Sequence, residues 1–279
     1  FQGTDPSSTT TWAMVGVWDI GAPVGERSLY KYAGDMLVIS QDGVIPMSAA
    51  LQSSRVNPKV AITDKIQYAI SEAVTLYGAN FGWQLLYVPT INQLWLNVPI
   101  DTGSNQQQYV MNTITGSWSR FTNVNAVCWI FINEELYFGL DGKVYLFWDC
   151  QSDNGAMINT DLLPAFSSFG NQAQQKRFNM CRISMGYDVS FAFNSRIALN
   201  FDQTTSPDTP YTAPQTNVAL WDTATWDSAI FGGSIMPYSS WQSAQGIGYY
   251  ASYRIRTSSN KSDIRYYATD YLLEAGGTI

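Results

Sequence analysis

Residues 136–144 have the sequence Leu136-Tyr137-Phe138-Gly139-Leu140-Asp141-Gly142-Lys143-Val144, in which strand-forming residues lie on each side of an Asp-Gly pair. Aromatic and β-branched side chains favour strands, and the Gly supplies the positive φ that a two-residue hairpin turn needs. A similar order occurs earlier, where Leu37–Ser40 precedes Asp42-Gly43 and Val44. The sequence therefore predicts antiparallel hairpins in an all-β protein.

These two stretches also indicate an internal repeat. From Asp42 to Asp141 the chain covers about two propeller blades of roughly 40–50 residues each. We therefore expect a propeller-like β domain at residues 4–152, built from radially arranged antiparallel sheets. The expected strands of this half are Ala13–Trp18, Ser28–Tyr32, Met36–Ser40, Val44–Met47, Trp83–Val88, Gln93–Val98, Gln108–Asn112, Ser117–Phe121, Ala126–Ile132, Glu135–Gly139 and Val144–Trp148.

One segment in this half has helical rather than strand periodicity. In 63–77, apolar residues recur at spacings of three and four, which predicts one inserted amphipathic helix of about four turns. Thr63 is expected to cap its N-terminus, and Gly78 to end it in the left-handed conformation. We expect the apolar face to pack on a sheet, although a docking role is an alternative.

The second half is predicted to be a separate antiparallel β-sandwich, residues 153–279, because the turn cluster Ser152-Asp153-Asn154-Gly155 marks a boundary. Two long alternating strands, Gly248–Thr257 and Ile264–Leu273, are expected to be joined by 260–263. The other expected strands are Ala156–Leu162, Phe166–Gly170, Lys176–Met185 and Val189–Phe201, and the Pro-containing stretch Asp202–Asn217 is expected to be a loop.

The start of the chain is set aside from the fold. Phe1-Gln2-Gly3 resembles the end of a protease-site tag, so residues 1–3 are interpreted as a tag remnant. Thr4–Thr11 would then be a linker or a loop between strands. No run of about 18 apolar residues occurs, so the sequence predicts no membrane span.

The composition argues for a protein that acts by contact. Charged residues are 13% of the chain, about half the usual share, whereas aromatic residues reach 14%. The formal charge is −7 and no stretch is dense in Lys or Arg, so sequence-specific nucleic-acid binding is not expected. A weakly acidic surface would instead let DNA slide past. The densest basic spot, Lys176-Arg177 with Arg182, is interpreted as interstrand ion pairing.

The residues for common catalytic and metal-binding arrangements are scarce. The chain has no His, which removes the commonest general base and metal ligand. Glu134-Glu135, expected on one strand, would point to opposite faces and could not form the carboxylate pair of a glycosidase. Asp149, Asp153, Asn154 and Asp161 lack the spacing of a calcium loop. We expect no enzyme activity, cofactor or metal.

The three cysteines do not form a recognisable framework. Cys128, Cys150 and Cys181 are odd in number and widely spaced, which fits neither a disulfide scaffold nor a zinc site. All three are therefore expected to be buried free thiols.

Four aromatic residues are the candidate contacts with a glycan or a protein partner: Trp221, Trp226, Tyr238 and Trp241. Amphipathic aromatic side chains suit both glycan faces and protein interfaces, and burial in sheet cores or subunit contacts is the simpler interpretation. A carbohydrate-binding module for host adsorption is accordingly the alternative to a structural role.

An ordered series of short motifs resembles a family of phage proteins. The series is Trp118-Ser119-Arg120-Phe121, residues 136–145, Asp153-Asn154-Gly155, Ala165–Gly170 and Gln175-Lys176-Arg177, followed near the end by Tyr271–Gly277. It is similar to the tail hub or nozzle proteins of double-stranded DNA bacteriophages, also described as packaged-DNA stabilisation proteins. Over roughly residues 117–180 and 265–279, the resemblance implies a virion tail protein with a propeller-like platform. It also implies a homo-oligomeric ring around a DNA channel, other tail proteins as partners, and no catalytic residues. The chain is short for a whole hub subunit and has only part of a propeller's repeats.

Overall fold

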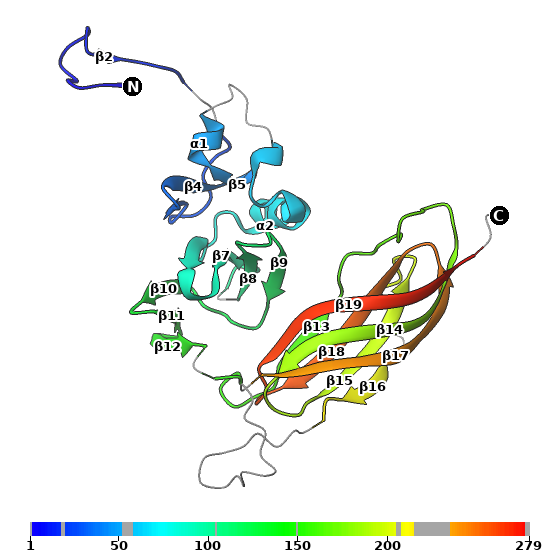
Figure 1. The fold of residues 1–279 in the computed structure, drawn as a ribbon. Coiled ribbons are helices and arrows are strands. Elements are labelled where there is room, and N and C mark those ends of the chain that lie inside the picture. Colours follow the sequence, from blue (N-terminus) through cyan, green and yellow to red (C-terminus); the bar gives the residue numbers. More distant parts are fainter. Residues whose placement is uncertain are drawn as a thin grey trace, which may run out of the picture. The chain divides into compact units, whose positions relative to one another are not determined.

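The computed structural model describes residues 2–17, 20–51, 58–103, 105–148, 150–204, 208–214 and 235–276. Strands make up 52% of the structure and helices 10%, which confirms the β-rich expectation (Figure 1). The chain divides into two compact units, Phe1–Trp148 and Asp149–Ile279, which are described separately below. The sequence had placed this boundary after Ser152.

The first unit contains three successive antiparallel sheets in which neighbours along the chain pair. The first sheet is β3 (Leu29–Tyr32), β4 (Asp35–Ser40) and β5 (Gly43–Pro46). The second is β6 (Gln84–Val88), β7 (Gln93–Pro99), β8 (Gln106–Asn112) and β9 (Trp118–Phe121). The third is β10 (Cys128–Ile132), β11 (Glu135–Leu140) and β12 (Lys143–Phe147). A short ribbon pairs β1 (Gln2–Gly3) with β2 (Trp12–Ala13). Within the described ranges these sheets are not identified as a closed barrel or propeller.

Tight turns join the strands of these sheets, as the Asp-Gly pairs predicted. Asp141 and Gly142 have φ of 50° and 72°, and Gly43 has φ of 108°. The Asn133-Glu134 turn, with φ of 52° and 65°, was not expected. Glu134 is therefore a turn residue, and the expectation that Glu134 and Glu135 share a strand is wrong.

The inserted helix is present but shorter than predicted. A 3-10 turn, η2 (Asp64–Ile66), precedes α2 (Gln67–Tyr77). The Thr63 hydroxyl accepts the backbone N–H of Val44 at 3.1 Å and makes no capping bond, so the N-cap prediction is wrong. Gly78 has φ of −58°, so it continues the helical conformation and donates its N–H to the Val74 carbonyl. The remaining helical segments are α1 (Met47–Ala50), η1 (Pro58–Val60) and η3 (Pro89–Ile91).

Helix α2 packs against the sheets of the first unit. Ile70 and Ala73 of α2 are buried in one cluster with Leu37 and Ile39 of β4 and Leu94 of β7. A second cluster contains Trp95, Trp129 and Leu136, and so joins the second sheet to the third. The helix thus contributes its apolar face to the core, as the sequence favoured.

In the second unit, the described residues form two antiparallel sheets over a common core. One sheet has the order β13 (Ile158–Leu162), β18 (Ala251–Ser259), β15 (Ala192–Leu199) and β16 (Thr209–Thr212). The other has the order β17 (Met236–Gly248), β14 (Lys176–Tyr187) and β19 (Ile264–Ala275). Cys181 and Ile183 of β14 share the core with Phe193 of β15 and Tyr253 of β18. The two sheets therefore bury side chains in one shared core.

Several strand predictions for this half were wrong. Phe166–Gly170 is not a strand, and only Ser167 bridges to Ala251. Strand β16 lies inside the stretch expected to be a loop, because a short edge strand tolerates Pro210. Strand β17 was not predicted. The two long strands joined by 260–263 exist as β18 and β19, but they belong to different sheets.

Candidate functional site: the outer face of the β17-β14-β19 sheet

A row of three side chains crosses the outer face of the β17-β14-β19 sheet. Trp241 of β17 is paired with Arg182 of β14, which is paired in turn with Asp270 of β19. The Arg182 guanidinium carbon lies 5.1 Å from the centroid of the Trp241 ring. Its Nε and Nη2 donate to Asp270 Oδ2 at 2.9 and 2.7 Å. The carboxylate therefore holds the guanidinium in position beside the indole, as a cation–π pair requires.

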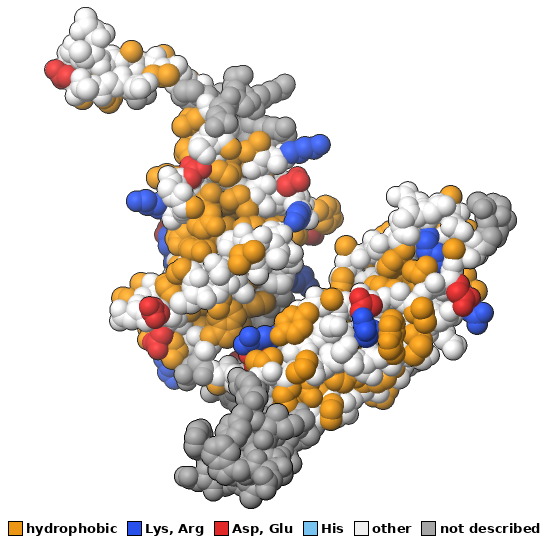
Figure 2. Space-filling model, viewed as in Figure 1, with side chains coloured by type: hydrophobic (Ala, Val, Ile, Leu, Met, Phe, Trp, Pro, Cys, Tyr) orange, Lys and Arg blue, Asp and Glu red, His pale blue; other side chains and the backbone are white. Residues whose placement is uncertain are grey.

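This row is open to solvent. The Trp241 side chain is 44% exposed, although Trp is usually highly buried. Leu272, opposite Met180, and Ile247, opposite Arg177, add exposed apolar surface on the same face. In Figure 2 hydrophobic side chains gather on the second unit among a few charged ones. Apolar and aromatic surface of this kind is typical of contact sites.

Tyr238 lies on the other face of β17, so the structure does not bring it together with Trp241. Its ring packs on the core, 5.6 Å from the Phe193 ring, and its hydroxyl accepts from Gln242 Nε2 at 3.3 Å. Gln242 Oε1 in turn accepts from the Ser195 and Tyr253 hydroxyls at 3.0 and 2.8 Å. This buried polar cluster was not predicted, because nothing in the sequence indicates which polar residues of a strand turn inward.

The other two candidate aromatics, Trp221 and Trp226, lie outside the described residues. Of the predicted site, the structure therefore places only Trp241 on an open surface. Its partners Arg182 and Asp270 were not predicted as contacts. Arg182 had been interpreted as part of an interstrand ion pair, and its bond to Asp270 across β14 and β19 has that form. Lys176 does not take part in an interstrand ion pair of this form. It is buried, and its ammonium donates to the Gln174 and Asn171 carbonyls.

The outer face of the other sheet carries a network of charges. Arg254 and Arg256 contact Asp161 at 2.5 and 3.6 Å, while Arg196 and Arg256 contact Asp208 at 3.2 and 3.3 Å. The hydrogen bond from Arg254 holds the pKa of Asp161 below its ordinary value, with smaller contributions from the nearby guanidinium charges. Asp161 is therefore engaged by arginines. It had been considered, with Asp149, Asp153 and Asn154, as an oxygen ligand.

In the described ranges, no group of three or more Cys, Asp or Glu side chains could hold a metal ion. Asp149 lies outside those ranges. The cysteines are free, but only Cys181 is buried, whereas Cys128 is half-buried and Cys150 is exposed. The prediction of three buried thiols therefore holds only for Cys181, and it is wrong for the exposed Cys150 and for the half-buried Cys128.

No family model and no curated protein matches the chain. Among the described helices, none has the length and apolar character needed to cross a membrane, as the sequence predicted.

Proposed function

We propose that the chain is a structural component of a bacteriophage tail, of the hub, nozzle or packaged-DNA stabilisation type, and acts through protein–protein interfaces. The open row of Trp241, Arg182 and Asp270 supports this proposal most directly. Trp and Arg are the residues most enriched at the energetic centres of interfaces, and the cation–π pair presents both in a fixed geometry. The motif series ending in Gln175-Lys176-Arg177 adds the resemblance to tail proteins.

The proposal includes an architecture larger than the described residues: a propeller-like platform and a ring of several copies. The three larger sheets of the first unit are antiparallel meanders, and we propose that they contribute to a propeller-like platform. A homo-oligomeric ring would arise from head-to-tail contacts between copies, because such contacts close around an axis. The weakly acidic chain, with formal charge −7, would repel rather than bind DNA passing through the ring.

The test is carried out on the virus that encodes the chain. Particles made without the protein should have incomplete tails in negative-stain micrographs, and wild-type protein supplied in trans should restore them. Purified wild-type particles should contain the protein in a fixed number of copies when peptides are quantified by mass spectrometry. Complete tails in the absence of the protein would refute the proposal.

A point variant localises the contact within the protein. Trp241→Ala removes the indole from the open face and should reduce incorporation into particles by about tenfold, since a central interface Trp contributes more than 1 kcal/mol. Phe201→Ala is the matched control, because Phe201 is also an exposed aromatic residue of this unit but lies in the turn after β15. Equal incorporation of both variants would exclude the Trp241 face as the contact.

The second candidate function is carbohydrate binding for host adsorption. It is favoured by the exposure of the Trp241 indole on a face that also carries Ser239 and Ser243. An aromatic ring with neighbouring hydroxyls suits a sugar. Binding of the full chain to a glycan array, lost in Trp241→Ala and retained in Phe201→Ala, would support this function. If the chain binds no glycan on the array, carbohydrate binding is refuted and the structural role remains as the proposed function.

A further inference from the structure

Strand β17 forms one edge of the β17-β14-β19 sheet, and its composition is unusual for an edge. It pairs with β14 on one side, and the described residues place no strand on its other side. Its 13 residues, Met236–Gly248, include no Lys, Arg, Asp or Glu. The opposite edge, β19, carries Arg265, Asp270 and Glu274. Natural sheets usually protect long edges with charged residues, so β17 is the edge that is open to pairing.

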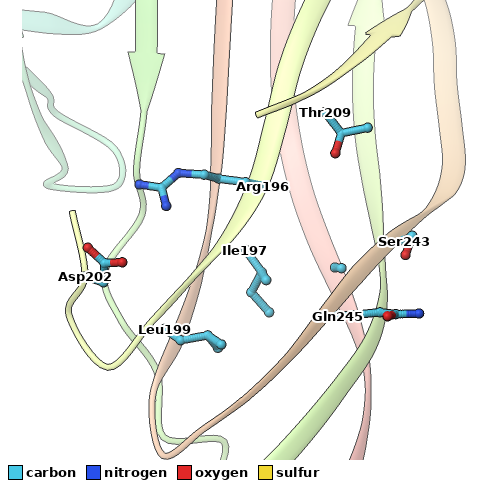
Figure 3. Close-up of a pocket in the computed structure, with 8 residues that line it drawn as sticks. Arg196, Ile197, Leu199, Asp202, Thr209, Ser243 and Gln245 are labelled. Atoms are coloured by element: carbon cyan, nitrogen blue, oxygen red, sulfur yellow. The ribbon is translucent and has the colours of Figure 1, made fainter. Parts of the chain in front are cut away.

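A depression lies beside this unprotected edge. It has a volume of about 330 Å³ and is lined by Ser243, Ala244 and Gln245 of β17, by Arg196, Ile197 and Leu199 of β15, by Thr209 of β16 and by Asp202. Figure 3 shows Ile197 and Leu199 of β15 on the side toward β17, whereas Arg196 extends toward Asp202 and Gln245 extends away from β15. Ala244 belongs to the core, whereas its neighbours Ser243 and Gln245 are exposed. Because successive residues of a strand point to opposite faces, a hollow that contacts all three lies beside the strand.

The opposite wall of the depression is an edge as well. Strand β16 pairs with Ala192–Ser195 of β15 and leaves Arg196, Ile197 and Leu199 without a paired strand on that side, although Thr209 at the start of β16 borders the hollow. Ile197 is packed against the core of the unit. The hollow thus lies between the edge strand β17 and the part of β15 beyond its pairing with β16, and it exposes apolar atoms that a further extended segment would cover. Addition of a strand to an open edge provides both main-chain hydrogen bonds and this burial.

We propose that β17 is the site at which a second copy of this chain binds, by antiparallel pairing of β17 with the same strand of the other copy about a two-fold axis. The two three-stranded sheets then join into one continuous sheet. Such an isologous contact places the same strand on both sides of the axis. Since β17 has no charged residue, no like charges meet across the junction, where they would be destabilising.

The alternative pairing of β17 with β19 of another copy is less favourable. Both strands are antiparallel to β14, so a head-to-tail contact would pair them in parallel. Parallel pairing is slightly less stable per residue than antiparallel pairing. The β17 contact is therefore separate from the contacts that would close a ring. The β17 contact rests on the proposed function in one respect: both treat the chain as a module that acts through protein–protein contacts, and here the partner is a second copy of the chain.

The test uses the full chain and two variants matched by position. Ser239 of β17 and Ala268 of β19 are both paired with Ser184 of β14, are both exposed, and so lie in the same row at opposite edges. Sedimentation velocity over a range of concentrations should show a monomer–dimer equilibrium. Ser239→Lys should raise the dimer dissociation constant by about tenfold or more, because it places a Lys of each copy at the junction. Ala268→Lys should leave the constant within about twofold of wild type, since its edge takes no part.

Hydrogen exchange locates the contact in the same samples. Peptides covering 236–248 should gain protection as the protein concentration rises through the dissociation constant, whereas peptides covering 264–275 should not. Circular dichroism melting verifies that both variants are folded. A wild-type chain that stays monomeric, equal effects of the two variants, or protection confined to 264–275 would each overturn the inference. If the isolated chain is monomeric but is present in particles, this inference fails and the proposed function stands.

Discussion

Among the described residues of the first unit, the Asn97 side chain has an unusually large number of interior hydrogen bonds. Its Nδ2 donates to the Gly82 and Ala126 carbonyls at 2.7 and 3.0 Å. Its Oδ1 accepts from Gln108 Nε2 at 2.8 Å and from Trp129 Nε1 at 3.0 Å. The side chain is fully buried, so one amide connects β7 and β8 to β10 in place of water.

Replacing Asn97 should therefore destabilise the first unit strongly. Asn97→Leu keeps the approximate volume but leaves two carbonyls and the Trp129 N–H without this partner. We expect a loss of about 3 kcal/mol in the free energy of unfolding, measured by urea titration with Trp fluorescence. Gln107→Leu is the control: the described side-chain hydrogen bond of Gln107 goes to the Tyr109 hydroxyl, and its loss should cost less than about 1 kcal/mol. Similar losses for both variants would contradict a central role for Asn97.

The cysteines differ in reactivity because they differ in burial. Burial raises the pKa of the Cys181 thiol to about 12, so almost no thiolate forms near neutral pH. Cys150 is exposed. At pH 8 a maleimide should modify Cys150 faster than Cys181 by at least about a hundredfold, as measured by peptide mass spectrometry. In urea, where burial is lost, both should react at similar rates. Fast modification of Cys181 in the folded protein would show that its core is open.

At the scale of elements, the sequence predicts best where the backbone itself demands a residue type. Asp141-Gly142 was predicted to be a turn because Asp and Gly tolerate positive φ, and both residues have positive φ in the structure. The start of α2 was not predicted correctly, because the Thr63 hydroxyl accepts the Val44 N–H of strand β5 instead of capping the helix. This contact is distant in sequence. The expectation that Gly78 ends the helix in the left-handed conformation was wrong, because a Gly after an amphipathic run can adopt positive φ but does not have to. Local chemistry was visible in the sequence, whereas tertiary contacts were not.

The candidate site illustrates the same limit. Trp241 could be predicted as a contact from its type, because exposed aromatics suit interfaces. Its orientation depends on β17 pairing with β14, and β17 was not predicted since its Ser, Gln and Gly residues do not alternate clearly with apolar ones. The row with Arg182 and Asp270 requires residues from three strands in register, and the pairing order of strands cannot be obtained from one sequence.

The hairpin turns of the first unit differ in how well their residues suit the backbone. Ala33 has φ of 51° and Asn133 has φ of 52°, and both side chains are exposed. Asn tolerates this left-handed conformation better than Ala. Ala33→Asn should therefore stabilise the unit by about 0.5 kcal/mol, and Asn133→Ala should destabilise it by a similar amount. Urea midpoints that move in the same direction for both variants would contradict this account.

At the scale of the second unit, the buried core predicts sensitivity to alkali. The unfolded chain loses the Cys181 proton near the ordinary thiol pKa of 9.0, whereas the folded unit keeps it until about pH 12. This contribution to stability is therefore complete below pH 9 and is lost as the pH rises toward 12, by up to about 1.4 kcal/mol per pH unit. Burial also raises the pKa of Tyr253 in the same core, which steepens the loss above pH 10.

Urea titrations at pH 8, 9, 10 and 11 would measure this slope. In Cys181→Ala the thiol is absent, so the decline between pH 9 and 10 should largely disappear while the Tyr253 contribution above pH 10 remains. A wild-type free energy of unfolding that is constant from pH 8 to pH 11 would show that the core admits water, and that burial does not control these protons.

For the whole molecule, the two units are expected to unfold as separate transitions. Each hydrophobic cluster of the described chain takes its residues from one unit only. Calorimetry should therefore resolve two heat-absorption peaks, since cooperativity follows a shared core. Asn97→Leu should lower only one unfolding temperature. Phe193→Ala, which removes a fully buried ring from the second unit at a cost of about 3–5 kcal/mol, should lower only the other. If either variant shifts both peaks equally, the units unfold together, and the chain is one cooperative domain despite its separate cores.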